Sequence, residues 1–393
     1  MGLFSFLSGQ KQNSVLSLVI DIGSSSVGAS LLKIEAGKPI QVLATDREDI
    51  SFQDRLSSSR FLLSMNHALE NTLKKIQAKN EAVPPHIFCT LSSPWFILKI
   101  RSLTMPNGES FKVTEKVIDD FFAKDIEQMK RELKNISPKE IEVIEKKIIQ
   151  VKLDEREVKN PLGKTAQKME IIASVAFSSK RVIQSVENNV KHFFPVSSLH
   201  FDSFPVVTFS AIRDIFPLEQ NFLFLDITGE TTDISLVVDD LLVRSVSFPR
   251  GKNFLIREIS SGLNTPHEEA ETLFGMFLRG TLDKESRTRV QGIVERGKDE
   301  WALSFEKALS AFSEKGSLPG IVFFTGDPDI AEPFARLINV HRSDLIQGGT
   351  FEARYLDKFM ISKYVSFESG VIRDPFLVIG ALFAKKLLTS KQI

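Results

Sequence analysis

The sequence of 393 residues is poor in several features that carry chemistry in other proteins. It has one cysteine, Cys89, so no disulfide can form within the chain, which favours a reducing compartment. Its six histidines are scattered, and no spacing among them suits a zinc site. Basic and acidic residues both number 50, and the zero net charge argues against nucleic-acid binding. No apolar run reaches the roughly 20 residues that a membrane-spanning helix needs.

The N-terminal segment is apolar from Met1 to Leu7. It is too short for a cleaved signal peptide. Gly2 is present, but Phe6 stands where a myristoylation signal requires Ser or Thr. The segment is therefore interpreted as a tail, residues 1–15, that is either packed on the body or used as a weak membrane or partner anchor.

Two segments that lie 205 residues apart share one pattern: residues 18–28, LVIDIGSSSVG, and residues 223–233, LFLDITGETTD. In each, an apolar strand ends in Asp-Ile and is followed by a turn rich in Gly, Ser and Thr. Two further strands follow, at 29–34 and 40–43 in the first copy and at 234–238 and 241–248 in the second. The repeat predicts two similar three-stranded meanders.

Such turns have the chemistry of a phosphate site, because successive backbone N–H groups can point at one anion. Glycine allows close approach of the backbone, and hydroxyl side chains add donors. Two turns that face each other can hold phosphates between two domains, and carboxylates can bind Mg²⁺ through its water shell. The alternative is a pair of ordinary β-turns. The predicted phosphate-binding residues are Gly23, Ser24, Ser25, Ser26, Gly229, Thr231 and Thr232, and the predicted metal-binding residues are Asp21 and Asp226.

The rest of the chain contains two further units. Residues 85–175 predict a small α+β unit, in which an amphipathic helix over 113–133 begins after Thr114 as N-cap. Residues 262–316 are predicted to be mostly helical. A buried strand ending in Thr325-Gly326 follows, and the last predicted helix spans 375–388.

This order of parts resembles the actin, heat-shock chaperone and sugar-kinase superfamily, and within it the FtsA and PilM group of bacterial actin-like proteins. The resemblance lies in the two Asp-centred hairpins, in the Asn160-Pro161-Leu162-Gly163 turn and in Thr325-Gly326. It implies an α/β fold of two actin-like (ribonuclease H-like) lobes with an inserted α+β subdomain and a short helical insertion. The implied division is 16–84 and 176–215 for lobe 1A, 85–175 for an SHS2 or 1C-like insertion, 216–261 and 317–393 for lobe 2A, and 262–316 for a 2B-like unit.

The resemblance also implies ATP and Mg²⁺ as cofactors, with Glu271 and Gly326 at the adenosine. Several residues depart from the family pattern, which makes a weak Mg²⁺-dependent ATPase or a non-hydrolysing protein the expectation. These departures are Thr228, Glu230, Phe274 and Asp327.

Three functions follow from the resemblance. The first is an FtsA-like ATP-binding scaffold in cell division, cytoplasmic and peripheral at the inner face of the membrane. The alternatives are a PilM-like protein of type IV pilus assembly and a non-hydrolysing scaffold with a degenerate nucleotide site. Expected partners are a second copy of the chain, as a dimer or filament, and the cytoplasmic tail of an inner-membrane or division-ring protein. The turn at 160–163 favours FtsA, whereas the 55 residues from Glu271 to Gly326 favour PilM, and residues 389–393 are too few for an FtsA-type C-terminal membrane helix. A small-molecule kinase is a further alternative, although no base for a substrate hydroxyl is evident.

Overall fold

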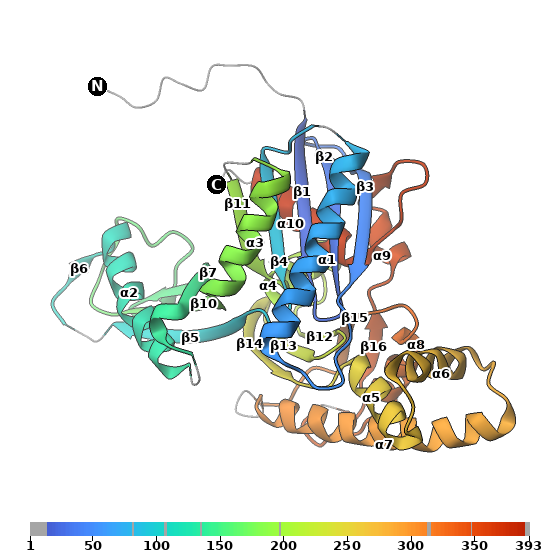
Figure 1. The fold of residues 1–393 in the computed structure, drawn as a ribbon. Helices are drawn as coiled ribbons and strands as arrows, with labels where there is room; N and C mark the ends of the chain where they lie inside the picture. The colour runs from blue at the N-terminus through green and yellow to red at the C-terminus, as the bar shows by residue number, and fades with distance from the viewer. Residues whose placement is uncertain are drawn as a thin grey trace.

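The computed structural model describes residues 14–389, apart from 81, 106–107, 134–135, 196–197, 313–315 and 347. The predicted N-terminal tail therefore lies almost wholly outside the described residues. Two large sheets, an inserted unit and a group of helices make up the molecule (Figure 1).

The first sheet has six strands in the order β11-β4-β1-β2-β3-β17. The strands β1, β2 and β3 form the predicted antiparallel meander, and β4 and β11 run parallel to β1. The bounds are β1 (Val15–Ile22), β2 (Ser26–Ile34), β3 (Ile40–Asp49), β4 (His86–Leu91), β11 (Ser198–Ser203) and β17 (Val365–Phe367).

Helices cover both faces of this sheet because its strands alternate apolar side chains between them. Leu18 and Ile20 pack with α1 (Ser58–Lys79) and α3 (Lys180–Phe193), whereas Val19 packs with α10 (Pro375–Thr389). A fourth helix, α4 (Phe204–Ile215), lies beside α10.

The second sheet repeats the topology of the first, with five strands in the order β14-β13-β12-β15-β16. The meander β12-β13-β14 is antiparallel, and β15 and β16 run parallel to β12. The bounds are β12 (Phe222–Ile227), β13 (Thr232–Val238), β14 (Leu241–Phe248), β15 (Ile321–Gly326) and β16 (Glu352–Tyr355). The two predicted meanders are thus confirmed.

One face of the second sheet packs against a group of helices around Trp301 and Phe305. These helices are α5 (Lys252–Leu263), α6 (His267–Arg279), α7 (Lys284–Ser310) and α8 (Ala331–Val340). The other face packs on α4 and α10, so these two helices lie between the two sheets.

The inserted unit projects from the first lobe and has its own core (Figure 1). Its main sheet is β5-β10-β7-β8, and its helix α2 (Glu115–Glu132) begins after Thr114, whose side chain accepts from the Val117 N–H as predicted. The other bounds are β5 (Ile97–Met105), β6 (Phe111–Lys112), η1 (Pro138–Glu140), β7 (Ile141–Leu153), β8 (Arg156–Glu157), β9 (Thr165–Ala166) and β10 (Met169–Ser179).

The C-terminal segment after β16 adds a strand to the first sheet and packs on both sheets. After α9 (Lys358–Ser362), β17 pairs in parallel with β3, and α10 packs on β1. The sequence-based division placed all of 317–393 in the second lobe. The difference arises because the apolar faces of α10 fit both sheets, and periodicity alone does not show which sheet a helix covers.

Candidate functional site

The first hairpin joins β1 to β2 at the predicted turn. The Gly23 N–H donates to the Ser26 carbonyl at 3.0 Å, which closes the turn. The indole Nε1 of Trp95 donates to the Gly23 carbonyl at 2.7 Å, and the Ile50 N–H donates to the Ser25 carbonyl at 2.7 Å. Neighbouring segments therefore hold this turn rigidly from both sides.

The second hairpin joins β12 to β13 and rests on the start of α5. The Thr228 N–H donates to the Thr231 carbonyl at 3.0 Å, and the N–H groups of Lys252 and Asn253 donate to the carbonyls of Thr228 and Gly229. Gly251 allows this approach, because a Cβ there would lie 2.1 Å from the Thr228 oxygen. The carbonyls of the hairpin thus cap the first turn of α5.

The two hairpins contact each other directly. Ser24 Oγ lies 2.7 Å from Thr228 Oγ1 and accepts a hydrogen bond from the Glu230 N–H at 2.8 Å. A Cβ placed on Gly229 would lie 2.6 Å from the Ser25 Cβ. The hydroxyl of Ser24, which the sequence assigned to phosphate, therefore binds the opposite hairpin.

A third segment, Ser92-Ser93, joins the contact. The Ser92 N–H donates to the Ile22 carbonyl at 2.9 Å, and the Thr231 hydroxyl donates to the Ser93 carbonyl at 3.2 Å. The Ser93 N–H in turn donates to Asp233 Oδ2 at 3.4 Å. The end of β4 therefore links the two hairpins, a role that no local sequence signal indicated.

Asp21 and Asp226 occupy equivalent positions, since Asp21 pairs with Thr90 of β4 and Asp226 with Thr325 of β15. Thr325 donates to Asp226 Oδ1 at 2.8 Å. Burial raises the pKa of Asp226 well above its usual range, and the neighbouring Asp233 adds to the rise. Among the described residues, no group donates a hydrogen bond to Oδ1 of Asp21 or Oδ2 of Asp226.

Asp21 differs from Asp226 in having a positive partner. Arg47 Nη2 lies 2.8 Å from Asp21 Oδ2, and the same guanidinium binds Asp374. Burial raises the pKa of Asp21 in spite of the opposing charge of Arg47. The two carboxylates in turn hold the pKa of Arg47 above its ordinary value, although burial acts in the other direction.

Glu230, the residue that departs from the family pattern inside the second hairpin, is 5% exposed. Its carboxylate binds the guanidinium of Arg257 and accepts from Asn253 Nδ2 at 2.7 Å. Both partners belong to α5. An acidic side chain therefore fills the space between the hairpin and the helix, and its charge is matched there.

The other predicted site residues lie apart from this contact. The Thr232 hydroxyl is directed into the second lobe, where it donates to the Arg250 carbonyl at 2.7 Å and accepts from Trp301 Nε1 at 3.1 Å. Gly326 is buried at the end of β15, and its carbonyl accepts from the Tyr355 hydroxyl at 3.0 Å. Glu271 lies on the exposed surface of α6.

Where Ser24 meets Thr228 and Glu230, the two hairpins leave no room for a phosphate. Their facing atoms are already at hydrogen-bond or van der Waals distance, and the adenosine residues Glu271 and Gly326 lie outside the contact. A divalent cation at Asp21 would meet the guanidinium of Arg47. In the described part of the chain, no cluster of three His, Cys, Asp or Glu residues is arranged to hold a metal.

A cavity of about 580 Å³ opens beside the second hairpin. It lies between the start of α1, the start of α3 and the entry to the inserted unit. Trp95, which stacks on Phe61 at 4.8 Å, is one wall, and Glu230 and Thr231 reach the other. The apolar residues that line it are Leu56, Phe61, Leu62, Pro94, Trp95, Ile136, Val182 and Pro249.

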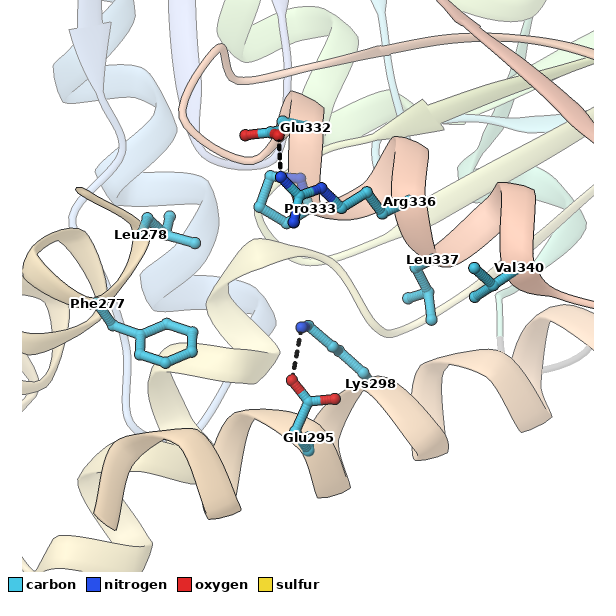
Figure 2. Close-up of a pocket in the computed structure, with 9 residues that line it drawn as sticks. All are labelled: Phe277, Leu278, Glu295, Lys298, Glu332, Pro333, Arg336, Leu337 and Val340. Carbon is cyan, nitrogen blue, oxygen red and sulfur yellow. Dashed lines mark hydrogen bonds and ion pairs between the residues drawn. The ribbon is translucent and has the colours of Figure 1, made fainter. Parts of the chain in front are cut away.

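A second cavity, of about 340 Å³, lies between α6, α7 and α8 (Figure 2). Phe277 and Leu337 contribute apolar walls, and the Glu295–Lys298 and Glu332–Arg336 pairs stand at its edge. None of the predicted site residues lines it.

Sequence comparison finds no protein-family profile and no curated protein that matches the chain. Comparison of folds finds a chain of a PilM–PilN type IV pilus biogenesis complex, with a TM-score of 0.64 and 16% identity over 94% of this chain and 96% of that chain. EutJ, an ethanolamine utilization protein from Carboxydothermus hydrogenoformans, follows with a TM-score of 0.44, 13% identity and coverage of 94% and 89%. MreB 5 of Spiroplasma citri bound to AMPPNP has a TM-score of 0.42, 10% identity and coverage of 96% and 98%.

The likeness to the PilM chain is one of fold, and it confirms the predicted actin-like architecture of two lobes. No described helix has both the length and the apolar character to cross a membrane.

Proposed function

We propose that this protein is a non-hydrolysing scaffold of the PilM-like type, which binds the cytoplasmic segment of a membrane-anchored partner. The observation that carries the proposal is the direct contact of the two hairpins, in which the Ser24 hydroxyl binds Thr228 and the Glu230 N–H. The match of fold over 94% of this chain and 96% of the PilM chain supports the PilM-like alternative. The proposal places the protein in the cytoplasm, at the inner face of the membrane.

The cavity beside Trp95 is the proposed docking position. Its lining is mostly apolar, and Arg181 and Glu230 supply one charge of each sign. Leu56 is 52% exposed at its rim, so this side chain has apolar surface to bury on a partner. A short extended segment with two or three apolar side chains matches this lining.

The test uses a peptide of the cytoplasmic segment of the PilN-type protein encoded in the same genome. Binding is measured by fluorescence anisotropy of the labelled peptide. Leu56→Glu is expected to weaken binding by roughly tenfold, because a charged side chain replaces an apolar contact of the interface. Leu218→Glu is the matched control, since Leu218 is 92% exposed and does not line the cavity.

Equal loss of binding in the two variants, or no binding by the unchanged protein, would contradict the proposed docking. Sedimentation of filaments with lipid vesicles would instead support the FtsA-like alternative. A titration with millimolar ATP, with and without Mg²⁺, is expected to show no saturable binding. Saturable binding with Mg²⁺ would restore the ATPase hypothesis.

A further inference from the structure

Arg47 is a densely hydrogen-bonded cation beside the first hairpin. It lies near the end of β3, and its guanidinium contacts three acceptors on different segments. Nη2 donates to Asp21 Oδ2 at 2.8 Å, Nη1 donates to Ser26 Oγ at 2.9 Å, and Nε donates to Asp374 Oδ2 at 2.6 Å. The face of the group lies over the Phe376 ring at 5.2 Å. The fork of donors is thus fixed in one geometry.

The first hairpin is shaped to admit this guanidinium. Gly28 of β2 pairs with Arg47 of β3, and a Cβ on Gly28 would lie 2.6 Å from Nη2 and 2.8 Å from Cζ. Any side chain at position 28 would therefore displace the group from Asp21. Glycine is required at position 28 because the guanidinium of Arg47 lies so close, and not because of its backbone angles.

The guanidinium binds the same carboxylate, Asp21, for which the sequence resemblance implies a metal. Asp21 is 3% exposed, and the sequence predicts that it binds Mg²⁺ through the water shell of the ion. Arg47 instead supplies a covalently attached positive charge at its Oδ2 atom. Through Asp374, which accepts from the Leu377 N–H at the start of α10, the same charge also ties the hairpin to the C-terminal helix.

We propose that Arg47 takes the place of the divalent metal at Asp21, so that the interlobe site of this protein is organised without magnesium. The guanidinium supplies a permanent positive charge that the carboxylates of Asp21 and Asp374 share. The contact between the hairpins then depends neither on metal concentration nor on nucleotide. This inference concerns the interlobe contact and is independent of whether the cavity beside Trp95 binds a partner.

The test measures metal binding by the full-length protein, with Mn²⁺ as the probe in electron paramagnetic resonance and Mg²⁺ in thermal unfolding. The unchanged protein is expected to bind no Mn²⁺ at the interlobe site, and its Tm should be the same, within about 1 °C, in millimolar Mg²⁺ and in EDTA. Arg47→Met removes the charge and keeps an unbranched apolar side chain. It is expected to lower the Tm. Millimolar Mg²⁺ should then raise the Tm of this variant by about 2–4 °C, because the ion binds the carboxylates that have lost their arginine.

Two controls make the result specific. Arg213→Met removes another arginine that stacks on a phenylalanine and pairs with an aspartate, Asp240, but at the surface, so it should create no response to metal. Adding Asp21→Asn to Arg47→Met should abolish the gained response. Mn²⁺ binding by the unchanged protein that disappears in Asp21→Asn would overturn the proposal, even if Arg47→Met does not fold. The proposal would also be overturned if Arg47→Met folds but neither binds Mn²⁺ nor gains Tm in Mg²⁺.

Discussion

Replacing Gly229 by alanine would test the contact between the hairpins directly. The new Cβ would lie 2.6 Å from the Ser25 Cβ, 3.2 Å from the Ser25 Cα and 3.0 Å from Asn253 Nδ2. Gly229 does not adopt the left-handed backbone conformation, so alanine is compatible with its backbone. The effect of the substitution should therefore arise from steric conflict, chiefly with Ser25 of the opposite hairpin and also with Asn253 of α5.

The magnitude follows from these distances. Carbon atoms pack at about 3.5–4.0 Å, so the hairpins must separate locally by roughly 1 Å. Overpacking of this kind costs about 1–3 kcal/mol. The separation also weakens the bonds of Ser24 to Thr228 and to the Glu230 N–H, each of which contributes about 1 kcal/mol. We expect the free energy of unfolding to fall by about 2–4 kcal/mol.

The assay is urea unfolding, followed by circular dichroism, with Gly292→Ala as matched control. Gly292 lies in α7 and a Cβ there would meet nothing within 4 Å, so alanine should raise the free energy of unfolding by about 1 kcal/mol through helix propensity. Ser25→Gly should restore part of the stability of Gly229→Ala, because it removes the nearest clashing atom. If Gly229→Ala is as stable as the unchanged protein, the hairpins are not in contact and the closed site is refuted.

Three further substitutions have defined outcomes. Burial raises the pKa of Asp233 from 3.8 to about 6. Between about pH 4 and pH 6 the folded protein therefore keeps a proton that the unfolded chain has released. The free energy of unfolding consequently falls as the pH rises through this range. Asp233→Asn should remove this dependence of stability on pH and raise the free energy of unfolding at pH 7 by up to about 3 kcal/mol. Urea unfolding from about pH 4 to 8 measures both effects. An unchanged dependence on pH would contradict the raised pKa of Asp233. Glu230→Ala should lower the free energy of unfolding by about 2–3 kcal/mol in the same assay, because it leaves Arg257 without its carboxylate partner. Adding Arg257→Ala to this variant should recover part of the lost stability. An unchanged stability of Glu230→Ala would show that the ion pair is not formed. Gly380→Ala should lower the Tm by several degrees, since its Cβ would lie 2.6 Å from Val19 Cγ1, and an unchanged Tm would contradict the packing of α10 on β1.

The fold was predictable because its strongest signals are local. Each hairpin contains, within eleven residues, an apolar strand, an Asp-Ile end and a turn of small residues. The structure gives the two copies equivalent registers, with Asp21 opposite Gly28 and Asp226 opposite Asp233. Strand periodicity and turn composition determine these features over short distances, so they can be recognised in a single sequence.

The direct contact between the hairpins and the residues that fill the site were not predictable, because they depend on side chains that are far apart in the sequence. Arg47 and Asp374 are separated by 327 residues, and Ser24 and Glu230 by 206. Neither pair leaves a pattern in the sequence. The sequence shows that Glu230 departs from the family pattern. Nothing in the sequence around Arg257 shows that this helix residue neutralises Glu230. Residues that fill a site from a distance can be identified only once the chain is folded.

The placement of α10 has a consequence for biosynthesis. The core of the first lobe on the side of Val19, Leu32 and Phe88 is completed by residues of α9, β17 and α10, which follow the whole second lobe in the chain. During translation the second sheet and its helices can therefore fold while the first sheet still exposes that face to solvent. Late arrival of α10 buries the exposed face and brings Asp374 to Arg47 in the same step. A nascent chain stalled before residue 358 should consequently be recognised by chaperones that bind apolar surface, and its release should be the event that joins the two lobes.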